Sequence, residues 1–322
     1  MNRPRLLLIY HRNPTTTAAY LEDALRRTAD VVTAGEGQDL AVARDEAVFL
    51  PRLLERAGGH FDLVLEVEGE NVPTHGHEQL EVPCAWWAID SHLHMSYDHH
   101  FFRAKRFDHV FVAQKHHVVR YRDWAWTESS WLPLAADPEV FHPIEGADRF
   151  VEIGFVGNVL PRLHEARRSL LRRIYEAFDR VLLVRGAWRE RVSEELARCR
   201  LVFNRSLHRD VNMRVFEALA CGRPLLTDRL DAECGLQELF TDGEHVILYD
   251  DATLEETARR WLADPEAAEG IGAAGREHVF AHHTYDHRAR TILETMGLLG
   301  EPRPAAEQTH CIAETNGSGG AN

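Results

Sequence analysis

The stretch DVNMRVFEALACGRPLLTD, residues 210–228, places charged and amide side chains inside a largely apolar sequence. Its pattern predicts a helix over residues 212–221 that leads into a buried strand. Asp210, Arg214 and Glu217 fall on one face of that helix because they are spaced at i, i+4 and i+7. Such a face can bind a polar ligand. The alternative is that Arg214 and Glu217 merely pair with each other on the surface.

The start of the same helix favours an anionic ligand. Asp210 or Asn212 is expected to cap it, and the predicted strand at residues 200–206 ends just before it. The helix N-terminus then lies at the carboxyl edge of a sheet, where its free amide groups attract anions. A phosphate fits this position, and Glu217 can accept hydrogen bonds from a ribose diol. Three arginines are expected near it: Arg205, Arg209 and Arg214.

A second candidate phosphate site is VEIGFVGNVLPRLHEARRSLL, residues 151–171. It predicts a strand, a glycine-containing turn and a helix, although it lacks the GxGxxG fingerprint of dinucleotide-binding proteins. Gly157 lets the backbone approach a phosphate that Arg162 can reach. The alternative is a tight turn followed by solvated arginines, namely Arg162, Arg167 and Arg168.

The first half of the chain contributes the unusual stretch WWAIDSHLHMSYDHH, residues 86–100. Asp90 or His92, after a predicted strand, can act as the base for an acceptor hydroxyl; alternatively, Asp90 caps the next segment and the histidines are solvated. Five side chains invite comparison with a metal site: His92, His94, Asp98, His99 and His100. Their spacing matches no zinc template, so we expect no metal.

The elements that must position these residues alternate between short apolar runs and longer amphipathic ones. Strands are predicted at residues 5–10, 30–34, 61–67, 83–89, 109–113, 130–134, 151–157, 180–186, 200–206, 223–228 and 245–250. Helices are predicted at residues 16–28, 43–57, 115–123, 164–178, 189–198, 212–221, 232–240, 254–262, 265–282 and 282–300. This alternation is typical of parallel sheets covered on both faces.

The pattern restarts near residue 151 after a proline-containing linker around residues 136–150. We therefore expect an α/β protein with two Rossmann-like domains that face a cleft, since ligands bind beyond the carboxyl ends of the strands. The expected domains span residues 1–140 and 150–282. A further helix follows at residues 283–300, and residues 301–322 have the composition of a disordered tail.

Composition narrows the class of protein. The net charge is −14, with 37 basic and 51 acidic residues, which argues against nucleic-acid binding and against attachment to anionic membranes by charge alone. The five cysteines form no CxxC pair. No apolar run is long enough for a signal-peptide core or a membrane span. We expect a cytoplasmic protein without stable membrane insertion.

Several segments together resemble GT-B glycosyltransferases, most closely the CgeB-like (spore-maturation-protein-type) group. The main one is FNRSLHRDVNMRVFEALACGRPLLTD, residues 203–228. Supporting segments are GFVGN (154–158), ELFTDGEHVILYDD (238–251), HTYDHRARTIL (283–293), WWAID (86–90), FDHVFVAQ (107–114) and WLPLAADPEVF (131–141). The likeness spans most of residues 60–295.

The resemblance implies a nucleotide-sugar donor held by the C-terminal domain, no metal or other cofactor, and a final helix that crosses back to the N-terminal domain. Glu217 matches the ribose-binding glutamate of that family. Many members carry a second glutamate eight positions earlier, where this chain has Arg209 beside Asp210. This departure leaves the stereochemical outcome open. The expected donor site comprises Gly157, Asn158, Arg162, Asn204, Arg205, Ser206, Asn212, Arg214 and Glu217, and the catalytic candidates are Asp90, His92 and Asp210.

The leading hypothesis is therefore a metal-independent glycosyltransferase that moves a sugar from a nucleotide sugar to an unidentified acceptor. Arginines and the helix N-terminus stabilise the leaving diphosphate, and Trp188 is a candidate for stacking on the base, with plain packing as the alternative. A second hypothesis is a nucleotide-sugar epimerase or hydrolase on the same fold. A third is a non-catalytic binding protein that retains the scaffold.

Overall fold

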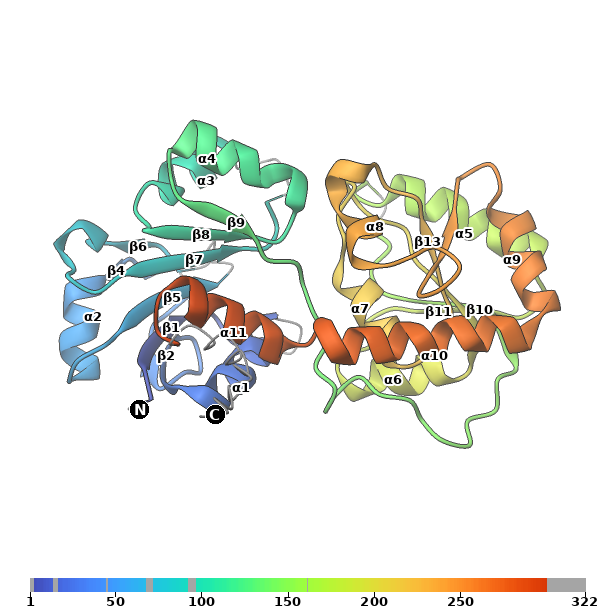
Figure 1. Ribbon diagram of the computed structural model, residues 1–322, viewed down its shortest axis with the longest axis horizontal. Coiled ribbons are helices and arrows are strands. Elements are labelled where there is room, and N and C mark those ends of the chain that lie inside the picture. The colour runs from blue at the N-terminus through green and yellow to red at the C-terminus, as the bar shows by residue number, and fades with distance from the viewer. Residues whose placement is uncertain are drawn as a thin grey trace, which may run out of the picture.

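The chain forms two parallel β-sheets, each flanked by helices (Figure 1). The computed structural model describes residues 3–13, 17–44, 46–67, 72–91, 97–160 and 162–299, without the side chains of residues 97–99. The first sheet ends with a strand at Ser129–Trp131 and the second begins at Val151. We call the residues up to this break the N-terminal half and those from 151 to 282 the C-terminal half.

The sheet of the N-terminal half has the strand order β3-β2-β1-β5-β7-β8-β9. Its strands are β1 (Arg5–Ile9), β2 (Asp30–Gly35), β3 (Leu40–Ala41), β5 (Leu63–Val67), β7 (Cys84–Ala88), β8 (His109–Val112) and β9 (Ser129–Trp131). All neighbours are parallel, with Leu8 of β1 beside Leu65 of β5. A separate two-stranded sheet joins β4 (Val48–Phe49) to β6 (Thr74–His75).

Side chains alternate along each strand of the first sheet, so the two faces of the sheet pack into two separate cores. Leu6 and Leu8 face one layer, formed by α1 (Thr17–Thr28) and α11 (Tyr285–Thr295), whereas Leu7 and Ile9 face the other. That second layer contains α2 (Leu50–Ala57), α3 (Tyr97–Ala104) and α4 (Val118–Ala125), with short 3-10 turns η1 (His77–Gln79) and η2 (Lys115–His117). Both faces are therefore covered, which explains the nearly continuous apolar strands.

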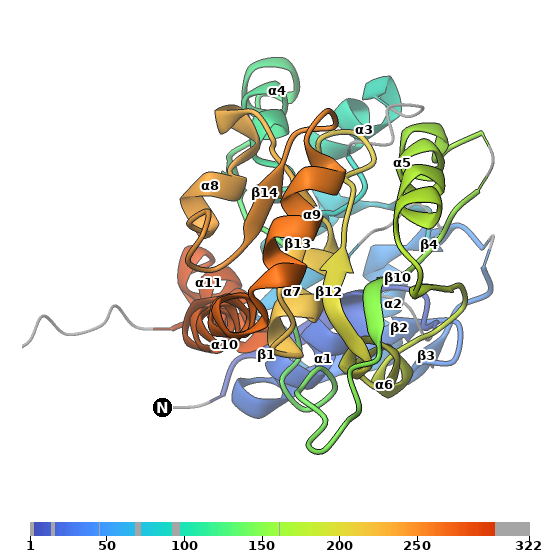
Figure 2. The same ribbon diagram turned by 90° about the vertical axis from the view of Figure 1, so that its right-hand side faces the viewer.

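The sheet of the C-terminal half has the order β11-β10-β12-β13-β14, so the strands that follow β10 lie on opposite sides of it. Its strands are β10 (Val151–Val156), β11 (Val181–Val184), β12 (Cys199–Phe203), β13 (Leu225–Asp228) and β14 (Ile247–Tyr249). Its helices are α5 (Glu165–Ala177), α6 (Glu190–Ala197), α7 (Met213–Ala220), α8 (Leu236–Leu239), α9 (Leu254–Ala263) and α10 (Pro265–His282), with η3 (Ala232–Cys234) (Figure 2). The reversal of strand order at β10 creates the topological switch point at which such folds bind ligands.

The last helix crosses back to the N-terminal half, as expected. α10 runs along the C-terminal half, and α11 then lies against α1 (Figure 1). The ring of Tyr285 stacks on Tyr20 at 5.3 Å, and Arg288 donates through Nε to the carbonyl oxygen of Pro133 at 2.7 Å. The fold prediction of two Rossmann-like domains with a returning helix is confirmed.

Every strand predicted from the sequence is present, although most are a residue or two shorter. The predicted helix 43–57 is wrong in its first half: α2 begins only at Leu50, and Pro51 in its first turn suits a helix start. Sequence analysis missed α3 and the two-residue strands β3, β4 and β6. These elements are too short to carry a periodic apolar signal.

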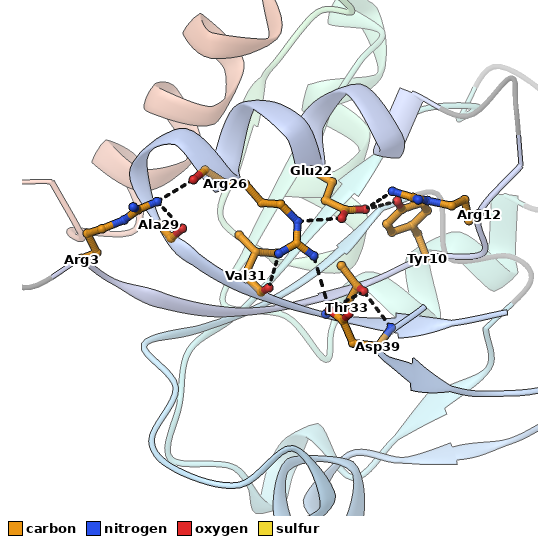
Figure 3. A network of polar contacts seen from close by, with 9 residues as sticks. All are labelled: Arg3, Tyr10, Arg12, Glu22, Arg26, Ala29, Val31, Thr33 and Asp39. Carbon is orange, nitrogen blue, oxygen red and sulfur yellow. Dashed lines mark hydrogen bonds and ion pairs between the residues drawn. The ribbon is translucent and has the colours of Figure 1, made fainter. Parts of the chain in front are cut away.

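A buried glutamate fastens α1 to the strands beneath it. The carboxylate of Glu22, only 4% exposed, accepts hydrogen bonds from the hydroxyl of Tyr10, from Arg12 and from Arg26 (Figure 3). Arg26 also donates to the carbonyl oxygen of Val31 at the start of β2. The network fixes the helix against β1 and β2. Among the described residues, no helix is both long and apolar enough to cross a bilayer.

Candidate active site

The ends of β10 and β12 are joined by one half-buried arginine from α7. Arg214 donates through Nε to the carbonyl oxygen of Val156 at 2.6 Å and through Nη1 to Oδ1 of Asn204 at 2.8 Å. Its guanidinium also lies 4.4 Å from the centroid of the Phe155 ring. Burial lowers the pKa of Arg214 to about 10, so it stays charged at neutral pH. A positive charge is thus fixed at the switch point of the sheet.

Gly157, directly after β10, is needed for this arrangement. A Cβ atom at this position would lie 1.9 Å from Nη2 of Arg214, and the backbone φ of 150° disfavours other residues. The missing side chain leaves room for the guanidinium. This geometry agrees with the predicted close approach at Gly157, and it explains the glycine by its contact with Arg214.

A pocket of about 140 Å³ opens beside Arg214. Glu217 and Met213 of α7 line it, with Trp188 and Arg189 from the segment after β11. Tyr20 of α1 closes it from the N-terminal half, with the Arg189 guanidinium 5.4 Å from its ring centroid. Its other lining residues are Val156, Gly157, Asn158, Ala187, Val192 and Arg214. The pocket therefore lies between the two halves.

Glu217 is the acidic group of this pocket. No hydrogen bond or ion pair engages its carboxylate within the described part of the chain, so the alternative surface pair with Arg214 is not formed. Burial raises the pKa of Glu217 to about 7, against the opposing charge of Arg214. A half-buried carboxylate without a partner is an open hydrogen-bond acceptor.

The predicted cap of α7 is wrong. Asn212 occupies the capping position, but its side chain makes no capping hydrogen bond. Both its amide nitrogen and its amide oxygen are buried without a partner among the described groups. Asp210 does not cap either, because its carboxylate accepts from the backbone N–H of Leu207 and closes the preceding turn. This bond gives Asp210 a structural role and keeps it out of the pocket lining.

Three of the predicted donor-site residues at the end of β12 are held by internal bonds. Asn204 donates to the hydroxyl of Thr227 at 2.9 Å while its oxygen accepts from Arg214. Ser206 donates its backbone N–H and its hydroxyl to the buried carboxylate of Asp228. Arg205 pairs with Asp228 at 3.2 Å and with Asp251 at 3.0 Å. Asn204 and Ser206 therefore hold the end of β12 in place and do not line the pocket.

The turn after β10 distributes its arginines differently from the prediction. Arg162 is exposed and does not line the pocket, whereas Asn158 does. Arg167, which the alternative interpretation of this turn leaves solvated, is 6% exposed and donates to the carbonyl oxygens of Asn158 and Arg205 at 3.0 and 2.7 Å. It ties together the two loops that flank the switch point. The i, i+3 and i+4 spacing of α5 places Arg167 on its inner face near Leu170 and Leu171.

Arg209, the departure from the family pattern, lies in a neighbouring depression of about 370 Å³. Its backbone has a left-handed φ of 64°, and its side chain pairs with Asp231 at 2.6 Å and with Glu233. Residues 205–209 and 228–231 line this depression at the ends of β12 and β13. The charge of Arg209 is thereby neutralised locally.

The N-terminal half presents its own polar groups at the ends of β7 and β8. Asp90 is half-buried after β7 and makes no hydrogen bond or ion pair among the described residues. The next residue, Ser91, lies 3.1 Å through its hydroxyl from Nδ1 of His117. Lys115, at the start of η2, forms an ion pair with Glu238 of the C-terminal half.

The predicted base His92 falls outside the described residues, as does His94. The described chain contains no group of three potential metal ligands. Sequence analysis missed Tyr20 and Arg189 as pocket residues. Arg189 lies three residues after the end of a predicted strand, a position that should have marked it. No local signal marks Tyr20, because only the packing of the two halves brings it there.

Comparison with known proteins agrees with this geometry. Residues 162–294 match the family described as glycosyl transferase-like. No curated protein shows significant sequence similarity to the chain. Solved structures with the same fold include sucrose-phosphate synthase from Thermosynechococcus elongatus, with a TM-score of 0.63 and 16% identity over 91% of this chain and 98% of that one.

Two further structural neighbours contain bound nucleotides. Anabaena Alr3699/HepE in complex with UDP-glucose has a TM-score of 0.64 and 14% identity, over 92% of this chain and 100% of that one. An alpha-glucosyltransferase in complex with UDP and a 13-mer DNA has a TM-score of 0.65 and 8% identity over the same shares. Residues 162–294 are thus similar to a glycosyl transferase-like family, and the chain shares the GT-B fold with these solved structures.

Proposed function

We propose that the protein is a metal-independent glycosyltransferase that takes its sugar from a nucleoside diphosphate donor bound beside α7. The proposal rests on two charged groups that line one pocket at the switch point of the second sheet. Arg214 is a cation held in place by hydrogen bonds, and Glu217 is a carboxylate without a partner. A nucleotide sugar needs both: a cation for the diphosphate and an acceptor for the ribose diol. The fold and the family match of residues 162–294 support the same reading.

Donor binding uses the groups around α7 in defined ways. The Nη2 side of Arg214 faces Gly157 and meets the diphosphate, whose charge grows as the sugar leaves. Glu217 accepts from the ribose, and the unpartnered amide of Asn212 supplies a further polar contact near the helix start. Trp188, 44% exposed at the rim, offers a stacking surface for the base.

The two halves must separate for the donor to enter. A pocket of about 140 Å³ is smaller than the roughly 300–1,000 Å³ typical of ligand sites. Tyr20 from α1 and its contact with Arg189 close this space. In the bound state, closure of the halves excludes water from the reacting centre and limits hydrolysis of the donor.

The acceptor is proposed to bind against the N-terminal half, with Asp90 or His92 as the group that takes the proton from its hydroxyl. Asp90 is free of partners among the described groups, which suits a base. Membership of the CgeB-like group, the cytoplasmic location and the absence of a cofactor remain proposals that rest on the sequence.

The deciding experiment measures the binding of UDP-, GDP- and dTDP-sugars by thermal shift and calorimetry to the wild type and to Glu217→Ala. We expect one donor class to bind and the variant to lose at least tenfold in affinity while its melting temperature is retained. Glu176→Ala, an exposed glutamate on α5, is the matched control. Equal donor affinity in Glu217→Ala would refute the ribose assignment.

Turnover then separates the competing functions. Consumption of donor without any acceptor would identify a hydrolase or epimerase. Donor binding without turnover on a broad acceptor panel would identify a non-catalytic protein. Release of nucleoside diphosphate that requires an acceptor hydroxyl is the result expected of a transferase.

A further inference from the structure

The N-terminal half concentrates its exposed aromatic side chains on one pair of helices. Phe102, Trp124 and Trp126 are 69%, 63% and 87% exposed, and Val119 is also exposed. In the described part of the N-terminal half, no other large apolar side chain is exposed to this degree. Side chains of this size rarely face water in a cluster unless another surface covers them.

α3 and α4 pack together, so these exposed side chains lie on or directly beside two neighbouring helices. The ring of Phe101 on α3 lies 5.3 Å from Trp124 and 5.4 Å from Tyr121 of α4. Phe102 follows Phe101 directly, and both helices lie at the same end of the molecule in two perpendicular views (Figures 1 and 2). Val119 lies in the first turn of α4, and Trp126 directly follows the last residue of that helix with a left-handed φ of 56°. We call Phe102, Val119, Trp124 and Trp126 the aromatic edge.

The charge around the aromatic edge is opposite to that of the whole chain. Residues 102–126 contain six cations and two acids, Asp108 and Asp123, in a chain of net charge −14. The only two lysines of the sequence, Lys105 and Lys115, are among these cations. No ion pair engages Lys105 or Arg122 among the described residues, and Lys105 lies 5.8 Å from the Phe102 ring centroid.

A small depression lies beside Phe102. It has a volume of about 230 Å³ and is lined by Pro73, Thr74, Phe102, Arg103 and Arg106. Arg106 uses one N–H on the carbonyl oxygen of Thr74 at 3.0 Å, which leaves further N–H donors of its fork. A phosphate group is the natural guest for guanidinium donors beside an aromatic ring.

We propose that the aromatic edge and its cations form a surface that docks peripherally on a bilayer containing anionic lipids. Tryptophan and phenylalanine favour the interface between headgroups and acyl chains, and neighbouring lysines and arginines attract anionic headgroups. Neither the aromatic side chains nor the cations suffice alone to hold this acidic protein on a bilayer, but together they strengthen its binding. Lys115 also forms an ion pair with Glu238 of the C-terminal half. Docking of the aromatic edge therefore places the opening between the two halves next to the bilayer.

The test is cosedimentation of the full chain with vesicles of phosphatidylcholine alone or mixed with phosphatidylglycerol. We expect binding to the anionic vesicles only, weakened by salt because exposed charges are screened. Trp124→Ala combined with Trp126→Ala should reduce partitioning at least tenfold, and Arg122→Ala about fivefold, the factor expected per surface cation. Phe150→Ala combined with Tyr175→Ala, two exposed aromatics in the linker before β10 and on α5, is the matched control and should bind as the wild type does.

Nucleotide binding by the tryptophan variant is measured in parallel and should be unchanged, which separates this proposal from the proposed function. Absence of binding to anionic vesicles, or equal binding by the tryptophan variant, would overturn the proposal. Self-association of the wild type that the tryptophan variant loses, without vesicle binding, would also overturn it and would assign the surface to a second copy of the chain.

Discussion

Two glutamates inside the molecule, one in each half, are treated in opposite ways. Glu66 of β5 is fully buried and accepts from the hydroxyl of Thr74 and from Nε2 of His77, both at 3.0 Å, and from Arg103. Burial alone would raise its pKa, but Arg103 and His77 outweigh it and lower the pKa below its usual value. Glu217 has a cation three residues away and yet no partner, and burial raises its pKa to about 7.

The difference separates a carboxylate that holds the fold from one that the described groups leave without a hydrogen-bond donor, as the proposed ribose contact requires. Glu66 joins β5, β6, η1 and α3 in a satisfied network, so its charge is compensated within the protein. Arg214 instead donates its hydrogen bonds to Val156 and Asn204, which leaves the Glu217 carboxylate without a hydrogen-bond donor. An unsatisfied polar group that persists beside a pocket points to binding, because it costs stability.

Removal of the satisfied carboxylate should have the largest effect. Glu66→Ala leaves Arg103 and His77 buried without their acceptor and should lower the free energy of unfolding by about 3–5 kcal/mol in urea titrations. The double variant Glu66→Leu/Arg103→Met removes both charges and should recover much of the loss. A single-variant loss below about 1 kcal/mol would contradict the distinction drawn between the two glutamates.

Glu22 supplies an intermediate case. It is buried, but its partners Arg12 and Arg26 are 50% and 41% exposed in their side chains and can return to water (Figure 3). Only the hydroxyl of Tyr10 stays buried without an acceptor, so Glu22→Ala should cost about 1–3 kcal/mol, less than Glu66→Ala. Thermal and urea unfolding of both variants gives the ranking, and the reverse order would refute it.

Gly157 provides a test of the ligand-binding role proposed for the pocket around Arg214 and Glu217. Gly157→Ala places a Cβ atom against Arg214 and should lower donor affinity about tenfold, as measured by calorimetry, while the chain stays folded. Gly186→Ala is the matched control, because Gly186 also has a left-handed φ, of 72°, but has open space around its Cα. If both variants bind equally well, the position of Arg214 is not what the glycine protects.

The smallest effect concerns pH. The raised pKa of Glu217 means that the folded state holds its proton more tightly, so this residue lowers stability as pH rises from about 4.5 to about 7. Glu217→Gln should therefore be more stable than the wild type at pH 7 by on the order of 1 kcal/mol, and equally stable near pH 4. Glu66, with a lowered pKa, stabilises above its unfolded pKa and loses this as pH falls. Parallel stability curves for wild type and Glu217→Gln would be evidence against the raised pKa.

Sequence patterns predicted the sheets well because buried parallel strands are continuous apolar runs separated by helices. Arg214 and Glu217 were recognised for a related reason: they are charged residues in a segment whose pattern predicts apolar packing. Gly157 was recognised because it lies in a predicted turn directly after a strand. The same logic failed for Asn204 and Ser206. Their position after β12 was right, but only tertiary contacts with Thr227 and Asp228 turn them inward.

Other parts of the site depend on contacts between distant segments. The burial of Arg167 could not be predicted, because its acceptors, the carbonyl oxygens of Asn158 and Arg205, are backbone atoms with no sequence signature. Tyr20 joins the pocket only through the packing of α1 against the C-terminal half, where Thr17 also lies 3.1 Å from the sulfur of Met213. Such contacts follow from the three-dimensional arrangement and cannot be predicted from local composition.

The return of α11 has a consequence for synthesis on the ribosome. Tyr20 and Trp87 belong to the half that emerges before the second sheet, whereas Tyr285, whose ring contacts both, is made after that sheet. The α1 face of the nascent N-terminal half therefore stays uncovered while the whole second sheet is translated, and it offers a site for chaperones during that interval. This face of the first half is covered only when α11 has left the exit tunnel.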